Sequence, residues 1–131
     1  MRDPVLFLGL DLAEVDRIAQ AVDRWGDHFL GRIFSEGELS TRRSHPAAFA
    51  QHVAGRFAAK EAAMKALGTG WRGLGFREIV VGREVSGKPT LRFTGRAQAR
   101  AEGMRVFQAE VTITHTAKTA AAVVALLCRP K

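Results

Sequence analysis

Tyrosine is absent from this chain of 131 residues, and cysteine occurs only once, as Cys128. A single cysteine cannot form an intrachain disulfide or supply the thiolates of a zinc cluster. The apolar run Val5–Leu10 is six residues long and ends at Asp11, which is too short for a signal-peptide core or a membrane span. We therefore expect a soluble protein of the reducing cytoplasm, with Cys128 buried or near the terminus.

Acidic residues are few relative to basic ones. The chain has 13 Asp and Glu against 20 Lys and Arg, a net charge of +7, and a pI of about 10.7. This excess predicts a polyanionic partner, and nucleic acid is the default for a small basic domain. However, the basic residues are spread along the chain, and no aromatic pattern for base stacking is present. A nucleotide cofactor or an acidic protein fits equally well, and a nucleic-acid-binding module without catalysis stays open as the alternative.

The pattern along residues 1–131 indicates a single domain with a mixed fold. No linker, internal repeat or low-complexity tract divides the chain, and its length suffices for one modest core. Segments with helical spacing are mixed with apolar runs and with alternating segments typical of hairpins. We therefore predict an α+β fold with a small, mainly antiparallel sheet.

The expected elements follow from caps, turns and periodicity. Asp11, with Glu14 as its capping partner, would begin the first helix, and Trp25-Gly26 would end it. The other expected elements are a buried strand over Phe7–Leu10, a short helix over Phe29–Phe34, a loop over Arg42–Pro46, a long helix that ends at Gly68, a glycine-rich loop over Gly68–Gly75, a hairpin over Ile79–Phe93 that turns at Ser86-Gly87, a helix over Thr94–Gly103 capped by Thr94, and strands over Phe107–Thr114 and Ala120–Leu127.

The most informative stretch is the predicted helix over Gly55–Gly68. Its composition of Ala, Met, Leu, Lys and Glu favours helix, and Glu61 and Lys65 stand four residues apart and so share one face. Arg56 lies little more than a turn before Glu61. A carboxylate and two cations in this arrangement could hold a metal ion and a phosphorylated substrate. An ordinary solvated helix with one ion pair is the simpler reading of the same spacing.

Asp11 is the second candidate ligand, at a predicted strand-to-helix junction. As a helix N-cap it would contribute about 1 kcal/mol, and this role is compatible with metal binding. Together, Asp11 and Glu61 would give an all-oxygen site with two carboxylates, which suits Mg²⁺ completed by water and phosphate oxygens. No His-x-x-x-His or cysteine cluster favours zinc.

Three motifs occur in a characteristic order along the chain. Gly-Leu-Asp-Leu begins at Gly9, Arg-Phe-Ala-Ala-Lys-Glu-Ala begins at Arg56, and Ile-Thr-His-Thr begins at Ile113. In this order they resemble the bacterial holo-acyl-carrier-protein synthases, the short, single-unit members of the 4′-phosphopantetheinyl transferase superfamily. The resemblance runs from about Gly9 to Leu127. It implies the 4′-phosphopantetheinyl transferase fold, with one unit in the chain.

The resemblance implies a Mg²⁺-dependent enzyme of fatty acid biosynthesis. Such an enzyme transfers 4′-phosphopantetheine from coenzyme A to a serine of apo-acyl-carrier protein and releases adenosine 3′,5′-bisphosphate. It makes Asp11 and Glu61 the metal ligands and Lys65 a catalytic residue that neutralises developing charge or supports departure of the leaving group. One of the two carboxylates, directly or through a water, would accept the serine proton. Which one does so stays open.

Further residues are assigned to coenzyme A by the resemblance. It implies that Arg56 lies near the 3′-phosphate, that His115 and Thr116 contact the coenzyme's phosphates, and that Lys88 and Pro89 form a hairpin turn near the nucleotide. Arg suits phosphate because its planar fork can bind two oxygens at once. On residue type alone, His115 is equally a structural, hydrogen-bonded histidine at a strand end.

The expected partners are coenzyme A and an acidic acyl carrier protein, with neither membrane nor nucleic acid. Arg17 and Arg24 lie seven residues apart on one stripe of the first helix and could contact the carrier protein, although nearby Asp residues also fit a plain solvated face. One unit in the chain implies, by the same resemblance, a homotrimer with interfacial active sites. The apolar strand Ala120–Leu127 is a plausible part of that interface.

Overall fold

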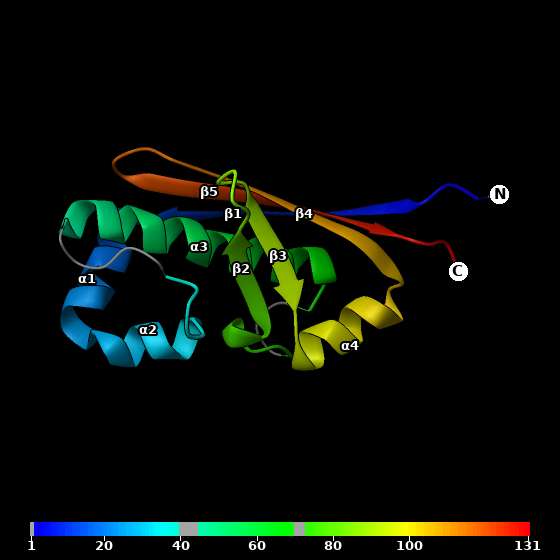
Figure 1. Ribbon diagram of the computed structural model, residues 1–131, viewed down its shortest axis with the longest axis horizontal. Coiled ribbons are helices and arrows are strands. Elements are labelled where there is room, and N and C mark those ends of the chain that lie inside the picture. Colours follow the sequence, from blue (N-terminus) through cyan, green and yellow to red (C-terminus); the bar gives the residue numbers. More distant parts are fainter. Residues whose placement is uncertain (1, 40–44, 70–72) are drawn as a thin grey trace.

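A three-stranded antiparallel sheet and one long helix form the centre of the fold (Figure 1). The computed structural model describes residues 2–39, 45–69 and 73–131. In chain order the elements are β1 (Val5–Glu14), α1 (Val15–Trp25), α2 (Asp27–Ile33), α3 (Pro46–Leu67), the 3-10 turn η1 (Phe76–Glu78), β2 (Ile79–Arg83), β3 (Pro89–Phe93), α4 (Gly95–Gly103), β4 (Val106–His115) and β5 (Thr119–Cys128). The predicted α+β class is confirmed.

The sheet has the strand order β1-β5-β4, so the C-terminal strand is central. In its register, Asp11 of β1 lies opposite Ala122 of β5, which lies opposite Ile113 of β4. Helix α3 packs along one face of this sheet, and α1 and α2 lie on the side of α3 away from the sheet (Figure 1). The β2–β3 hairpin forms a separate two-stranded sheet beside α3.

Helix α3 approaches the sheet closely because its contact surface is made of small residues. Ala58, Ala59, Ala62 and Ala63 are all fully buried. A Cβ atom placed on Gly9 of β1 would lie 1.8 Å from the carbonyl oxygen of Ala62, so only glycine permits this approach. A helix that is apolar on nearly every side belongs in a core, and α3 is accordingly covered by the sheet, by α1 and by the hairpin.

The predicted N-cap role of Asp11 is wrong. Strand β1 continues past Asp11 to Glu14, and α1 begins at Val15. Every residue of β1, up to the pair Glu14–Thr119, is matched with β5, and this ladder takes precedence over a local cap. Glu14 occupies the N-cap position without a side-chain capping hydrogen bond.

The predicted strand over Phe7–Leu10 exists but is not buried within one chain. Leu6, Leu8, Leu10 and Leu12 lie on the sheet face opposite α3 and are between 54 and 65 % exposed. Their partners on β5 are Leu127, Ala125, Val123 and Ala121. No helix of the described residues covers this outer face, so an apolar surface is open to solvent.

Most of the predicted element ends are correct. Gly26 (φ 52°) separates α1 from α2, and Gly68 (φ 74°) ends α3 in the left-handed conformation that glycine adopts readily. The hairpin turn and α4 lie where expected, but the Thr94 side chain does not cap α4. Instead, Glu78 Oε2 accepts a hydrogen bond of 2.9 Å from the Arg96 N–H in the first turn of α4.

Two predicted loops fall partly outside the described residues, namely those over Arg42–Pro46 and Gly68–Gly75. Cys128 is buried at the end of β5, as expected, and burial raises the pKa of its thiol. Within the described parts of the chain, no helix combines the length and the apolar character needed to cross a bilayer.

Candidate functional site

Asp11, Glu61 and Lys65 come together where β1 crosses α3. Asp11 lies two residues beyond Gly9 on the same face of β1, so its side chain points toward α3. Lys65 Nζ donates hydrogen bonds of 3.0 Å to Asp11 Oδ1 and 3.0 Å to the Leu10 carbonyl oxygen. Glu61 lies one turn before Lys65 on the same side of the helix. Residues separated by 50 positions in sequence thus form one polar cluster, which we call the acidic group.

The electrostatics of this group are dominated by two neighbouring carboxylates. Burial raises the pKa of Glu61, the negative charge of Asp11 raises it further, and Lys65 partly offsets both effects. The Asp11 side chain is 13 % exposed and that of Lys65 is 55 % exposed, so the group lies at the edge of the core. Among the described residues, no cluster of three or more His, Cys, Asp or Glu forms. A cation held here would therefore need water or ligand oxygens to complete its shell.

A second group of predicted residues lines a cavity of about 360 Å³ between α3, the β2–β3 turn and the end of β4. Arg56, Pro89 and His115, all predicted from sequence, line this cavity, and so do His52 and Arg83, which were not. No carboxylate is among its described lining residues. The cavity is therefore electropositive and suited to an anion.

Two of the predicted coenzyme residues do not reach this cavity. Lys88 Nζ lies 3.1 Å from Glu110 Oε1 in an exposed ion pair that joins the hairpin to β4. The Thr116 hydroxyl accepts hydrogen bonds from the N–H groups of Lys118 (3.2 Å) and Thr119 (3.1 Å) and so stabilises the β4–β5 turn. His115, in contrast, is exposed at the cavity edge, with Nδ1 3.3 Å from the Thr116 carbonyl oxygen.

Helix α3 separates the two groups. Arg56 and Lys65 are nine residues apart, about 2.5 turns, so they project from opposite sides of the helix. Asp11 lies on β1 and His115 on β4, the two edge strands of the sheet. The acidic group and the electropositive cavity of one chain therefore face different directions.

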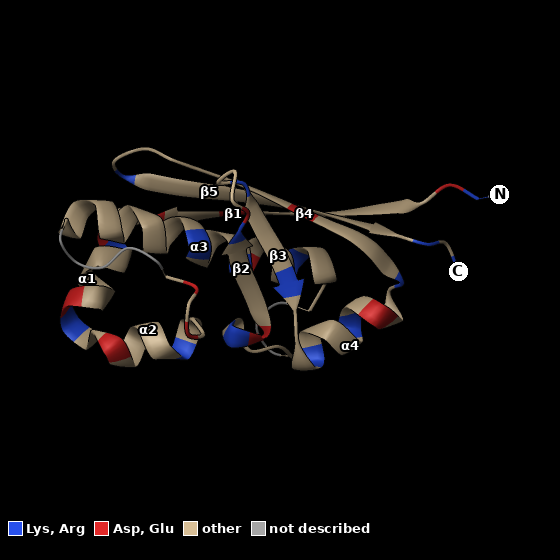
Figure 2. Cartoon of the chain, in the orientation of Figure 1, with Lys and Arg blue, Asp and Glu red and all other residues tan. Residues whose placement is uncertain are grey.

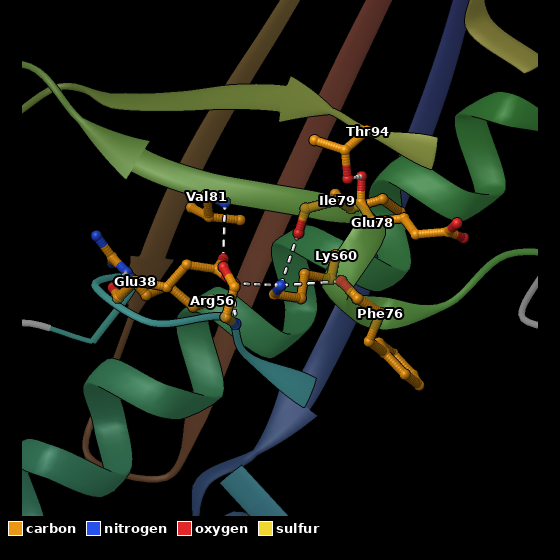
Figure 3. Close-up of polar contacts among 9 residues, drawn as sticks. Glu38, Arg56, Lys60, Phe76, Glu78, Ile79, Val81 and Thr94 are labelled. Carbon is orange, nitrogen blue, oxygen red and sulfur yellow. Dashed lines mark hydrogen bonds and ion pairs between the residues drawn. The ribbon is translucent and has the colours of Figure 1, made fainter. Parts of the chain in front are cut away.

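A buried ion pair that sequence reasoning missed lies beside Arg56, whose Nε donates a 3.2 Å hydrogen bond to the Glu38 carbonyl oxygen (Figure 3). Lys60 is fully buried, and its Nζ donates hydrogen bonds of 2.9 Å to Glu38 Oε1, 2.9 Å to the Phe76 carbonyl oxygen and 2.6 Å to the Ile79 carbonyl oxygen. Glu38 Oε2 accepts a 2.8 Å hydrogen bond from the Val81 N–H. These bonds tie the segment after α2 and the hairpin to α3. The available sequence signal was that Phe57, Ala63 and Met64, three or four residues from Lys60 and so on its side of the helix, are apolar.

Comparison with known proteins shows the family to which the chain belongs. Residues 7–124 match the family model described as the 4′-phosphopantetheinyl transferase superfamily. The chain belongs to this superfamily. A curated relative, the holo-[acyl-carrier-protein] synthase of Koribacter versatilis, is 46 % identical over 123 residues, which are 93 % of this chain and 98 % of the relative.

Solved structures of superfamily members have the same fold. The holo-[acyl-carrier-protein] synthase of Neisseria meningitidis superposes with a TM-score of 0.80 at 31 % identity and covers 92 % of this chain and 96 % of its own. The Helicobacter pylori holo-[acyl-carrier-protein] synthase, in complex with coenzyme A, superposes with a TM-score of 0.79 at 28 % identity, covering 91 % and 98 %. The resemblance predicted from the three sequence motifs is thereby confirmed.

The predicted carrier-protein residues of this superfamily member lie on α1. Arg17 and Arg24 are both exposed, and the Arg24 guanidinium lies 5.0 Å from the ring centroid of Trp25, which is itself 54 % exposed. Figure 2 shows acidic residues alongside basic ones on α1 and α2. The surface therefore has mixed charge around two arginines and an aromatic ring.

Proposed function

We propose that this chain is a holo-[acyl-carrier-protein] synthase. It transfers 4′-phosphopantetheine from coenzyme A to a serine of apo-acyl-carrier protein, releases adenosine 3′,5′-bisphosphate, and serves fatty acid biosynthesis in the cytoplasm. The observation that carries the proposal is the meeting of Asp11, Glu61 and Lys65 at the contact of β1 with α3. The shared family and the high identity to a relative of that name support it.

Asp11 and Glu61 are the proposed ligands of Mg²⁺. Burial and, after it, the nearby charge of Asp11 raise the pKa of Glu61, and a bound cation would offset the repulsion between the two carboxylates. Two carboxylates without histidine or cysteine form the oxygen donor set that Mg²⁺ prefers, with remaining positions for water and phosphate. When bound, the ion would neutralise charge on the pyrophosphate of coenzyme A.

The chain's own residues position the reactants and move one proton. The serine Oγ forms a bond to the phosphorus next to the pantetheine, and the bond from that phosphorus to the bridging oxygen breaks, so that adenosine 3′,5′-bisphosphate departs with the electron pair. Lys65 Nζ, at the rim of the site, stabilises the negative charge on the departing oxygens. Asp11 or Glu61, directly or through a water, accepts the serine proton.

The electropositive cavity is the proposed site for the 3′-phosphate of coenzyme A. Arg56 and His115 would bind the phosphate, and Pro89 would lie against the nucleotide. Lys88 and Thr116 are proposed to act at the edge of this site, where Lys88 would exchange Glu110 for a phosphate oxygen. Arg suits this task because it can bind two phosphate oxygens at once.

A homotrimer with active sites between chains is the proposed assembly. The acidic group and the cavity face different directions, so a coenzyme bound to the acidic group of one chain would reach the cavity of a neighbour. The exposed leucines of β1 and the strand Ala120–Leu127 supply an apolar face of the kind that obligate oligomers bury. Arg17 and Arg24 on α1 would contact the acidic carrier protein and accelerate its association.

Intact-protein mass spectrometry of an apo-acyl-carrier protein tests the function. We expect a phosphopantetheine-sized mass gain after incubation with this chain, coenzyme A and Mg²⁺. The gain should vanish with EDTA and with the Asp11→Ala and Glu61→Ala variants. A folded protein that binds coenzyme A but modifies none of several carrier proteins would indicate a different acceptor, and absence of both binding and transfer would refute the proposal.

A further inference from the structure

His52 stands out among the residues that line the electropositive cavity. It is the fourth residue before Arg56, so the two side chains lie on the same side of α3. Its Nε2 atom is buried and has no hydrogen-bond partner in the described part of the chain. A buried polar atom without a partner costs stability, and here the atom belongs to a residue that lines an open cavity.

The charges around His52 are all of one sign. Arg56 comes from α3, Arg83 from β2 and His115 from β4. Burial, followed by the positive charges of Arg56 and Arg83, lowers the pKa of His52 to about 4. The nearest buried carboxylate, that of Glu38, accepts hydrogen bonds from Lys60 and the Val81 N–H and is not among the cavity-lining residues. Burial and, after it, the two guanidinium groups therefore keep the imidazole neutral at neutral pH.

We propose that His52 and Arg83 extend the phosphate-binding set of this cavity, and that His52 becomes protonated and donates a hydrogen bond from Nε2–H to a bound phosphomonoester dianion. This inference rests on the proposed function, because the 3′-phosphate of coenzyme A is such a group. Arg56 and Arg83 hold the dianion from two sides, and the buried nitrogen of His52 gains the partner that it lacks.

The dianion reverses the electrostatic environment of His52. A nearby negative charge favours the imidazolium form, so the pKa of His52 rises when phosphate binds. Binding near pH 7 is then accompanied by proton uptake, and affinity falls as the pH rises through the pKa of the complex. The phosphate itself takes up a proton only near its second pKa of about 6. The effect of His52 is therefore isolated above that pH.

Calorimetric titration with two nucleotide probes tests the inference. Adenosine 3′,5′-bisphosphate carries the 3′-phosphate, and adenosine 5′-phosphate lacks it. We expect His52→Leu to weaken the bisphosphate about tenfold, since a hydrogen bond to a charged group contributes about 1.5 kcal/mol or more and tenfold corresponds to about 1.4 kcal/mol. The affinity for adenosine 5′-phosphate should not change. His52→Gln keeps an N–H donor without a charge and should fall between.

Proton uptake gives a readout that a merely structural role would not move. The enthalpy of bisphosphate binding at pH 7, measured in buffers of different ionisation enthalpy, should depend on the buffer for the wild type and lose that dependence in His52→Gln. In the transfer assay, the same variant should raise KM for coenzyme A and leave kcat within about twofold, because the 3′-phosphate is remote from the reacting phosphorus. His28→Gln, at an exposed histidine of α2, is the matched control.

The outcomes separate this inference from the function on which it rests. A folded His52→Gln protein with unchanged bisphosphate affinity and unchanged buffer dependence overturns the role of His52 while the transferase assignment stands. Arg83→Gln with wild-type affinity likewise removes Arg83 from the set. A wild-type protein that binds neither coenzyme A nor the bisphosphate refutes the proposed function and this inference with it. Should His52→Leu fail to fold, His52→Gln carries the test.

Discussion

Two lysines of α3, five residues apart, form ion pairs of nearly equal length in opposite environments. Lys60 lies 2.9 Å from Glu38 and Lys65 lies 3.0 Å from Asp11. The Lys60 side chain is fully buried, whereas that of Lys65 is 55 % exposed. Burial lowers the pKa of Lys60 and the neighbouring Glu38 opposes that effect. Charge and distance are the same, so what differs between the two pairs is access to water.

This difference in exposure separates a structural ion pair from one that a ligand can reach. Lys60 donates hydrogen bonds to backbone carbonyl oxygens of the η1–β2 segment as well as to Glu38. The buried pair therefore fastens the hairpin to α3. Lys65 is bound at the exposed rim, where the proposed function has it exchange Asp11 for a substrate oxygen. Ion pairs of one helix thus divide into one that is satisfied by the protein and one that is available to a ligand.

Removal of the buried lysine should have the largest effect. Lys60→Met leaves the Glu38 carboxylate buried without its cation, and breaking such a pair costs about 3–5 kcal/mol. The free energy of unfolding from urea titration should fall by that amount. The double variant Lys60→Met, Glu38→Gln should recover part of the loss, because the charge that remained is also removed. A single-variant loss below about 1 kcal/mol would contradict the comparison.

Removal of the exposed lysine should spare stability and reduce catalysis. We expect Lys65→Met to lower kcat/KM of carrier-protein modification about 100-fold, the scale of losing one charge-stabilising group in a transition state, with an unchanged Tm. Lys118→Met, at an exposed lysine of the β4–β5 turn, serves as control for a lost surface charge. A fall in Tm as large as that of Lys60→Met would show that the two ion pairs contribute equally to stability.

Glu61 should have a small effect on thermal stability, and this effect depends on pH. Folding raises the pKa of Glu61 above its ordinary value of 4.5, so the folded chain holds this proton more tightly than the unfolded chain. Stability from this group is therefore present below pH 4.5 and is lost as pH rises through the folded pKa. Without metal at pH 7, Glu61→Gln should raise Tm by a few degrees, and the gain should disappear near pH 4.

Adding Mg²⁺ sharpens this last prediction. The ion should raise the Tm of the wild type at pH 7, since a ligand that binds the folded state stabilises it, and should leave Glu61→Gln unchanged. Calorimetric scans at pH 4 and pH 7, with Mg²⁺ and with EDTA, provide the four conditions. Equal response of both proteins to Mg²⁺ would contradict the role of Glu61 as a ligand.

The sequence predicted spacing and element ends within one helix, and it missed contacts between segments that are distant in the chain. The pairing of Glu61 with Lys65 on one face and the end of α3 at Gly68 follow from spacing and residue type alone. The role of Lys60 could not be derived, because its partner Glu38 is 22 residues away. His52 could have been found from its four-residue spacing to Arg56. Arg83 could not, since only the packing of the hairpin beside α3 brings it there.

Asp11 was misplaced for a related reason. Its local sequence favours a helix cap, and that preference competes with strand pairing to β5, which involves residues more than 100 positions later. The carboxylate nevertheless reached the predicted neighbours. The structure therefore places Asp11 beside Lys65 and Glu61, although the local rules predicted the wrong backbone conformation for it.

Gly9 gives this site an unusual dependence on a residue that has no side chain. With the Ala62 carbonyl 1.8 Å from where a Cβ would lie, the depth of β1 against α3 is set by backbone contact, and Asp11 is carried two residues along the same rigid strand. A change at Gly9 would shift the carboxylate without altering any polar atom. A genetic screen for loss of activity would therefore return Gly9, a position that by its burial and lack of a side chain looks like core packing.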